Sequence, residues 1–199
     1  YTVEELASIA SIQMLAAEAE SKLEVIESPS HHVTMKSAVI EGNPNKIGYA
    51  EVVLDASIEE CACNEYFDSR ENSNDFYKNG GITRNIFSYN SHCLIKRNIY
   101  NTGIPGFDHR QFVWKVMWRR IDEDTMVVVY DPISTGLDPI WNFVATSKDV
   151  VNAKSWALVT YKKLLAVNGI PQTKMSYLSQ ANVGGHIPIK LMNKYIPFR

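Results

Sequence analysis

The cysteine and histidine residues are the first place to look for chemistry, and their spacing matches no common site. Cys61 and Cys63 lie two residues apart in a predicted helix, which directs the two thiols to different faces, so a shared metal ion is not expected. The five histidines are scattered, without an HExxH zinc motif or a Cys-x-x-Cys pair. We therefore expect no metal, no cofactor and no catalytic residue, and interpret these side chains as surface or satisfied core residues.

Basic residues on predicted strands are the next candidates, because their cationic groups can pair with a phosphate. Four of them could do so: Lys96, Arg97, Arg119 and Arg120. Arg119 and Arg120 are better explained as a solvated strand face, or as partners of Asp122 and Asp124 in the turn that follows. Arg97 is the candidate for a polar anchor in a binding site.

The central stretch, residues 108–133, carries a row of large apolar side chains. The residue types alternate, and the apolar row on one face consists of Phe112, Trp114, Val116 and Trp118. This period of two is typical of a β-strand. An acidic turn at 122–124 leads to a β-branched and aromatic run that includes Val128, so the stretch predicts an antiparallel hairpin. The aromatic row needs a sizeable cover, which is either a helix or a ligand.

Helices are predicted on both sides of this hairpin. Thr2 and Glu5 form a capping box before an apolar stripe, and this helix is predicted to end near Ser28. A second capping box opens a helix over 57–67, and the polar segment 70–78 is ambiguous between helix and loop. A last helix is predicted over 188–195, with Pro188 in its first turn.

Further strands are indicated by apolar alternation and by the turns between them, at 33–40, 47–55, 82–89, 92–100, 150–163 and 173–183. Strands joined by hairpins form an antiparallel sheet, and a large twisted sheet curls, so a closing helix can cover its apolar face. The order predicts an α+β protein with a helix-grip fold. In that fold a curved antiparallel sheet grips a C-terminal helix, and here a long N-terminal helix is added.

Composition favours a single domain spanning 1–199. Lys and Arg number 20 against 22 Asp and Glu, a net charge of −2, and nothing suggests a nucleic-acid surface. No apolar run approaches the roughly 20 residues of a membrane span. Three cysteines and no glycosylation sequon favour a reducing, cytoplasmic setting. The chain begins without Met, so we expect a segment of a longer protein with other domains.

Three motifs resemble the START domain, the StAR-related lipid-transfer family. Residues 108–113 (DHRQFV) resemble the family's R-D/E-F-V signature, with Gln111 in place of the acidic residue. Residues 55–60 (DASIEE) look like the opening of its second helix, and 185–193 (GHIPIKLMN) resemble the entry into its C-terminal helix. Val116 falls where sterol-binding members tend to carry a buried Arg, and Arg97 falls near the place of its acidic partner.

The resemblance implies a tunnel between the sheet and the C-terminal helix that holds one lipid. The lining residues that we predict are mostly large and apolar: Trp114, Val116, Trp118, Val128, Trp156, Met175, Tyr177, Met192 and Tyr195. An ordinary core packed on the last helix is about equally compatible with these residue types. The loop 101–108 is implied at the tunnel mouth, where Ile104 and Phe107 are predicted to contact a membrane transiently during exchange.

Two other functions stay open from the residues alone. The same fold with its tunnel filled by Trp114, Trp118 and Trp156 predicts an interaction or regulatory module. Helix-grip relatives also include polyketide cyclases, so an enzyme is the third alternative. An empty apolar cavity of ~500 Å³ would cost on the order of 10 kcal/mol. A ligand, ordered water or bulky side chains must therefore fill such a space.

Overall fold

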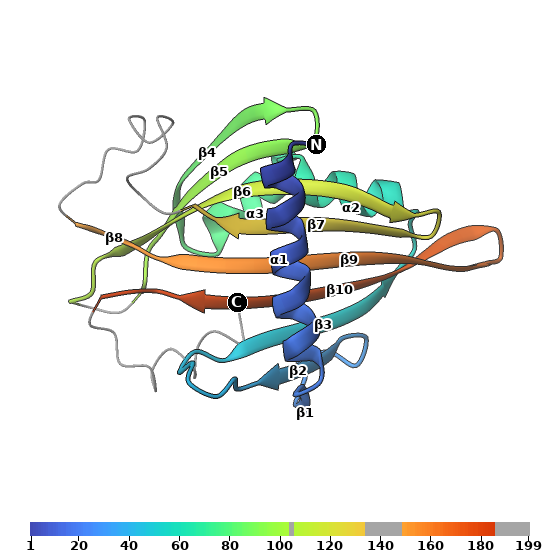
Figure 1. Ribbon diagram of the computed structural model, residues 1–199, viewed down its shortest axis with the longest axis horizontal. Helices are drawn as coiled ribbons and strands as arrows, with labels where there is room; N and C mark the ends of the chain where they lie inside the picture. Colours follow the sequence, from blue (N-terminus) through green and yellow to red (C-terminus); the bar gives the residue numbers. More distant parts are fainter. Residues whose placement is uncertain (104–105, 134–148, 186–199) are drawn as a thin grey trace.

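The computed structural model describes residues 1–103, 106–133 and 149–185, and in these ranges three helices lie against one sheet of ten strands. Nine strands follow the order β1-β2-β3-β10-β9-β7-β6-β5-β4, and β8 pairs with β6 beside this path. Figure 1 shows the sheet as a broad, twisted surface with α1 across it. The helix predicted over 188–195 lies outside the described residues.

The centre of the sheet is the predicted hairpin. It consists of β6 (His109–Asp122) and β7 (Thr125–Pro132), which pair antiparallel with Val116 opposite Tyr130 and Trp118 opposite Val128. β6 extends past the apolar row at both ends, because it begins at His109 and continues to the acidic turn. The alternation of the sequence is therefore real, and one face of β6 presents the apolar row.

The remaining strands flank this hairpin, and all of them except β1 lie within or close to the segments predicted as strands. They are β1 (Glu24–Ile26), β2 (Thr34–Ala38), β3 (Ile47–Leu54), β4 (Gly81–Asn90), β5 (Cys93–Tyr100), β8 (Val150–Asn152), β9 (Lys154–Val167) and β10 (Ile170–Asn182). The expected single strand over 150–163 was wrong. The chain breaks at Ala153, whose N–H donates to the carbonyl of Gln111, so that β8 pairs parallel with β6 whereas β9 pairs antiparallel with β7 and β10.

Both predicted capping boxes are present. Thr2 and Glu5 cap α1 (Val3–Glu20), and Ser57 and Glu60 cap α2 (Ile58–Tyr66). The ambiguous polar segment is a helix, α3 (Arg70–Lys78), whose first turn is capped by the Ser69 side chain. The predicted end of the first helix was wrong, because α1 stops at Glu20 and the following residues pair as β1 with β2. Tertiary pairing there overrides the helical spacing of the apolar residues.

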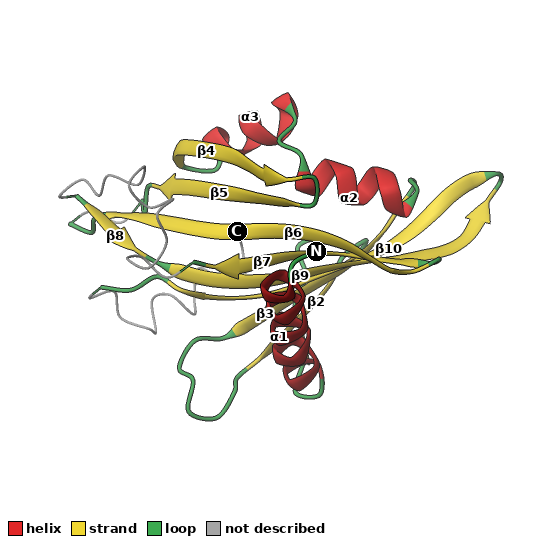
Figure 2. Cartoon of the chain, turned by 45° about the horizontal axis from the view of Figure 1, so that its top comes forward, coloured by secondary structure: helices red, strands yellow, loops and turns green. Residues whose placement is uncertain are grey.

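The helices lie on opposite faces of the sheet. Figures 1 and 2 show α1 crossing one face roughly perpendicular to the strands, while α2 and α3 lie on the other face, where α2 packs mainly on β7 and β9 and α3 packs on β4. We name these the α1 face and the α2 face. The apolar stripe of α1, Ile9, Ile12, Ala16 and Ala19, is buried against Met117, Val127 and Val129 of the central hairpin, among others. None of the described helices is long and apolar enough to cross a membrane.

One hairpin of the sheet extends beyond the helices that cover the two faces. The hairpin of β9 and β10 turns at Asn168 and Gly169, both of which have positive φ as a tight turn of this kind requires. Residues 162–167 of β9 are all exposed, and Leu165 is 92% exposed. In Figures 1 and 2 this hairpin projects past the ends of its neighbours.

Candidate functional site

The candidate site is the α2 face of the sheet, where the predicted aromatic row lies. Trp114 is the centre of this face. Its ring stacks on Phe112 with centroids 5.4 Å apart and meets Tyr130 edge to face at 5.9 Å. Its indole N–H donates to the Ser155 carbonyl oxygen at 2.7 Å. An aromatic side chain with an apolar body and a satisfied polar tip suits a rigid wall.

The other predicted lining residues on the α2 face differ in how far their side chains are exposed. Val116 and Val128 are fully buried, whereas Trp118 and Met175 are half-buried against the same apolar cluster. Tyr177 on β10 is 36% exposed. Burial nevertheless raises the pKa of the Tyr177 hydroxyl well above its usual range, and the charge of Glu65 adds to this shift. Of the predicted lining residues, the structure thus brings six together on one face: Trp114, Val116, Trp118, Val128, Met175 and Tyr177.

Trp156 does not belong to this group, and its predicted place in the lining was wrong. It packs on the α1 face with Leu158 and the helix α1, and its indole N–H donates to Gln180 Oε1 at 3.3 Å. The pairing of Tyr130 with Ala157 places Ala157 on the α2 face. The neighbouring residue Trp156 must then point to the other side, because successive side chains of a strand alternate.

Arg97 was also assigned to the wrong face. It lies opposite Val113 in β6 and therefore shares the α1 face. Its guanidinium donates to Gln111 Oε1 at 2.8 Å and to Asn85 Oδ1 at 3.1 Å. Gln111, which replaces the acidic residue of the motif, thus still accepts a hydrogen bond from a basic neighbour. Arg97 cannot anchor a ligand beside Trp114.

Lys96 takes the place on the α2 face that Arg97 was expected to hold. It pairs directly with Trp114 across β5 and β6, and its Nζ lies 5.8 Å from the centroid of the Tyr130 ring. Burial lowers the pKa of the Lys96 ammonium, and the nearby charge of Arg84 acts in the same direction. The residue type was visible in the sequence, but a pair of adjacent basic residues does not reveal which one faces inward.

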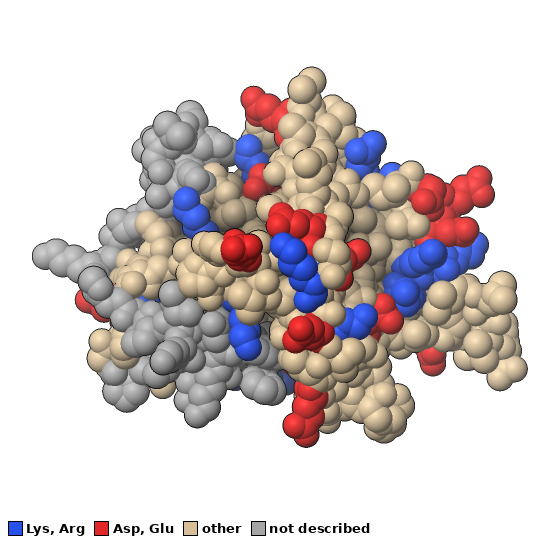
Figure 3. Space-filling model, turned by 60° about the horizontal axis from the view of Figure 1, so that its bottom comes forward, with Lys and Arg blue, Asp and Glu red and all other residues tan. Residues whose placement is uncertain are grey.

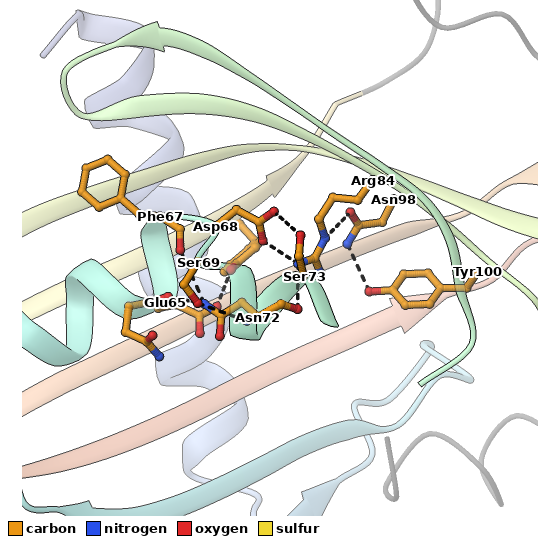
Figure 4. Close-up of polar contacts among 11 residues, drawn as sticks. Glu65, Phe67, Asp68, Ser69, Asn72, Ser73, Arg84, Asn98 and Tyr100 are labelled. Atoms are coloured by element: carbon orange, nitrogen blue, oxygen red, sulfur yellow. Dashed lines mark hydrogen bonds and ion pairs between the residues drawn. The ribbon is translucent and has the colours of Figure 1, made fainter. Parts of the chain in front are cut away.

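A polar network joins the helices to this face. Figure 4 shows Arg84 and Asn98 beside the ends of α2 and α3. Arg84 forms an ion pair with Asp68 at 2.7 Å and donates from Nε to Asn98 Oδ1 at 3.2 Å, while Asn98 donates to the Tyr100 hydroxyl at 3.1 Å. This network could not be predicted from the sequence, because it depends on α3, whose segment was ambiguous between helix and loop.

Glu65 adds a second polar contact on the α2 face. The Tyr130 hydroxyl donates a short hydrogen bond to its carboxylate. Burial, together with this carboxylate, raises the pKa of Tyr130 far above its usual range, so the phenol stays protonated. Glu65 therefore already holds one donor from the sheet.

The predicted gate is described only in part. Phe107 is half-buried, and its carbonyl accepts a hydrogen bond from Thr102 Oγ1 at 3.2 Å. Ile104, Met192 and Tyr195 lie outside the described residues. The gate is therefore still a prediction.

The remaining charges are paired on the surface. Figure 3 shows acidic and basic side chains next to one another on one face of the molecule, in keeping with pairs such as Lys174 with Glu51 and Lys163 with Asp124. Arg120 pairs with Glu59 of α2 rather than with the predicted turn residues. Within the described ranges, no group of three or more His, Cys, Asp or Glu side chains could hold a metal ion.

Comparisons with known proteins agree on the fold. No family model and no curated protein sequence matches the chain. Human StAR-related lipid transfer protein 5 superposes with a TM-score of 0.75 at 12% identity, over 98% of this chain and 88% of that protein. A StAR-related lipid transfer protein fragment from Xanthomonas axonopodis gives 0.66 at 14% identity, over 87% and 89%.

A third structure extends this likeness. The lipid transfer and protein localization domain of human StarD13 gives a TM-score of 0.62 at 13% identity, over 95% of this chain and 88% of that domain. These likenesses confirm the predicted resemblance at the level of the fold. The chain has the α+β fold of the StAR-related lipid transfer (START) domains, with a long N-terminal helix and a large curved antiparallel sheet.

Proposed function

We propose that this chain binds a single lipid or a similar hydrophobic molecule against the α2 face of its sheet, and that it acts as a carrier rather than as an enzyme. The ligand would lie along Trp114, Met175 and Tyr177, between the sheet and the segment that follows β10. Met192 and Tyr195 of the predicted closing helix would complete the enclosure.

The observation that carries this proposal is the state of Tyr177. Burial raises the pKa of its hydroxyl, so the group is surrounded by protein, yet 36% of the side chain is exposed. We interpret this combination as the mark of a side chain that faces an internal space. The proposed space would be apolar on this side, because Met175 packs against the cluster that contains Trp114.

Burial of an apolar chain would drive the binding. Each Å² of apolar surface removed from water contributes about 25 cal/mol, and a filled space avoids the cost of an apolar void. The likeness in fold to two structures named as StAR-related lipid transfer proteins supports the same interpretation. Exchange would require the loop that contains Ile104 and Phe107 to move from the closing helix, with transient membrane contact.

Native mass spectrometry with a panel of lipids tests the proposal. We expect the 199-residue chain to retain one apolar molecule through purification or to take one up from the panel. Met175→Trp should fill part of the space and abolish uptake with little loss of stability. Val53→Trp, at a half-exposed position of β3, is the matched control and should bind as wild type does. If wild type binds no member of the panel, the proposal fails.

A second candidate function rests on the packing of the aromatic cluster. Trp114 is only 8% exposed and is closed in by Phe112 and Tyr130. If these rings and the closing helix occupy the whole interior, the domain is an interaction module instead. The same experiment separates the two functions, because a filled domain takes up no lipid and Met175→Trp would then destabilise it by overpacking.

A further inference from the structure

Lys96 is the most unusual residue of the α2 face. It lies on β5, the strand next to the edge strand β4, opposite Trp114 of β6 on one side and Ile86 of β4 on the other. Lysine is almost never buried without a partner, because removing an ammonium group from water is costly. Lys96 is half-buried, so part of its long stem can stay exposed, but burial is still the main cause of the lowered pKa of its ammonium.

The ammonium of Lys96 has no hydrogen-bond or ion-pair partner among the described residues. In the part of the chain that the structure describes, this ammonium lies over the ring of Tyr130, with Nζ 5.8 Å from the ring centroid. Lys96 therefore has donors to offer, although each of its charged neighbours is already engaged. Arg84 is paired with Asp68, and Glu65 accepts the hydrogen bond from Tyr130.

We propose that Lys96 recognises the anionic headgroup of an amphipathic ligand, a carboxylate or a phosphate ester joined to an apolar chain. This inference rests on the proposed binding function and names the class of ligand for the same site. The apolar chain would lie along Trp114 and Met175, and the anionic oxygen would accept hydrogen bonds from Lys96 Nζ.

An anion suits this position better than a neutral acceptor. Hydrogen bonds between two charged groups are shorter and roughly twice as strong as neutral ones. Arg84 disfavours the charged form of Lys96, whereas Glu65 and Asp68 favour it, and neither carboxylate forms a direct ion pair with Lys96 among the described residues. An anionic oxygen of the ligand would supply such a direct partner. Lys96 Nζ lies over the ring of Tyr130, whereas the Glu65 carboxylate accepts from the hydroxyl of the same tyrosine. The ammonium and the carboxylate thus contact different parts of Tyr130.

The test compares ligands that share a chain and differ in the headgroup. Palmitate, a 16-carbon lysophosphatidate and uncharged hexadecanol are titrated into the full chain, and binding is followed by displacement of a fluorescent apolar probe. Wild type should bind both anionic ligands at least about tenfold more tightly than hexadecanol. Acetate and inorganic phosphate, which lack an apolar chain, should not displace the probe.

The variant that removes the recognition group is Lys96→Met, which keeps the length and apolar character of the stem. It should lose the preference for anions while binding hexadecanol within about twofold of wild type. Lys96→Arg keeps the charge and should retain a preference. Lys115→Met is the matched control, because Lys115 is a half-buried lysine on the α1 face of the adjacent strand.

The outcomes separate this inference from the proposed function. Failure of wild type to bind any of the amphiphiles overturns both. Equal binding of charged and uncharged amphiphiles by wild type, or a preference that persists in Lys96→Met, overturns the inference and leaves the binding function intact. Displacement by acetate or inorganic phosphate alone would mean that Lys96 binds free anions rather than a lipid headgroup, which also overturns it.

Discussion

The two faces of the sheet are built from the same strands and differ in what covers them. On the α1 face, the small and branched residues of one helix are buried against Met117, Val129 and Leu158. On the α2 face, large aromatic rings, a lysine and a tyrosine with an exposed ring share the surface with α2 and α3. Each face has its own buried apolar cluster, and on our proposal the second face also binds the ligand.

The largest expected effect is on the α1 face. Ile9 of α1 is completely buried there, so Ile9→Ala should lower the free energy of unfolding by about 2–5 kcal/mol. Met175→Ala on the α2 face removes a similar volume and should cost less than half as much, because Met175 is only half-buried. Urea unfolding of both variants measures the difference. Equal losses would mean that the α2 face is packed as tightly as the α1 face.

The second-largest expected effect is on the pH dependence of stability, and it comes from Glu5 in the first turn of α1. Burial alone would raise the pKa of Glu5, but hydrogen bonds from the Thr2 backbone, Asn90 and His92 outweigh it and lower the pKa to about 2. In the unfolded chain the pKa is near 4.5. The carboxylate therefore stabilises the fold above about pH 4.5, and this contribution disappears as the pH falls towards 2.

The measurement for Glu5 is the urea midpoint between pH 6 and pH 2. Glu5→Gln should lose on the order of 1–2 kcal/mol at pH 6 and show a smaller decrease in stability below about pH 4.5 than wild type. Glu4 in the same turn is exposed, and Glu4→Gln provides the matched control. An unchanged pH profile in Glu5→Gln would contradict the assigned role.

The smallest expected effect is the stability of Lys96→Met on the α2 face. An unpaired and partly buried cation contributes little to folding, so its replacement by a side chain of similar shape should change the free energy of unfolding by no more than about 1 kcal/mol, with either sign. Thermal unfolding without ligand measures this directly. A loss above about 3 kcal/mol would show that Lys96 supports the fold rather than a ligand.

The strands and caps could be predicted because their signals are local. The alternation around Trp114 and the capping boxes at Thr2 and Ser57 each depend on residues a few positions apart, and all three are present. The end of α1 was missed because the residues after Glu20 are drawn into pairing with β2, a contact that the helical pattern does not contain.

The candidate site was harder to predict because it depends on which face each strand presents. Trp156 and Arg97 have plausible residue types for a binding site, and both lie on the α1 face. A break at Ala153 and the register between neighbouring strands decide these orientations. A shift of one residue reverses every side chain of a strand, so residue type alone could not distinguish Arg97 from Lys96.

The projecting hairpin of β9 and β10 has a consequence for handling the protein. Its tip around Asn168 has exposed side chains and lies beyond both helical layers, so it can open without disturbing either core. Amide protons there should exchange with deuterated solvent long before those of β6 and β7. The same turn is a suitable place to insert a short peptide tag, and a position at which a protease would nick the folded chain.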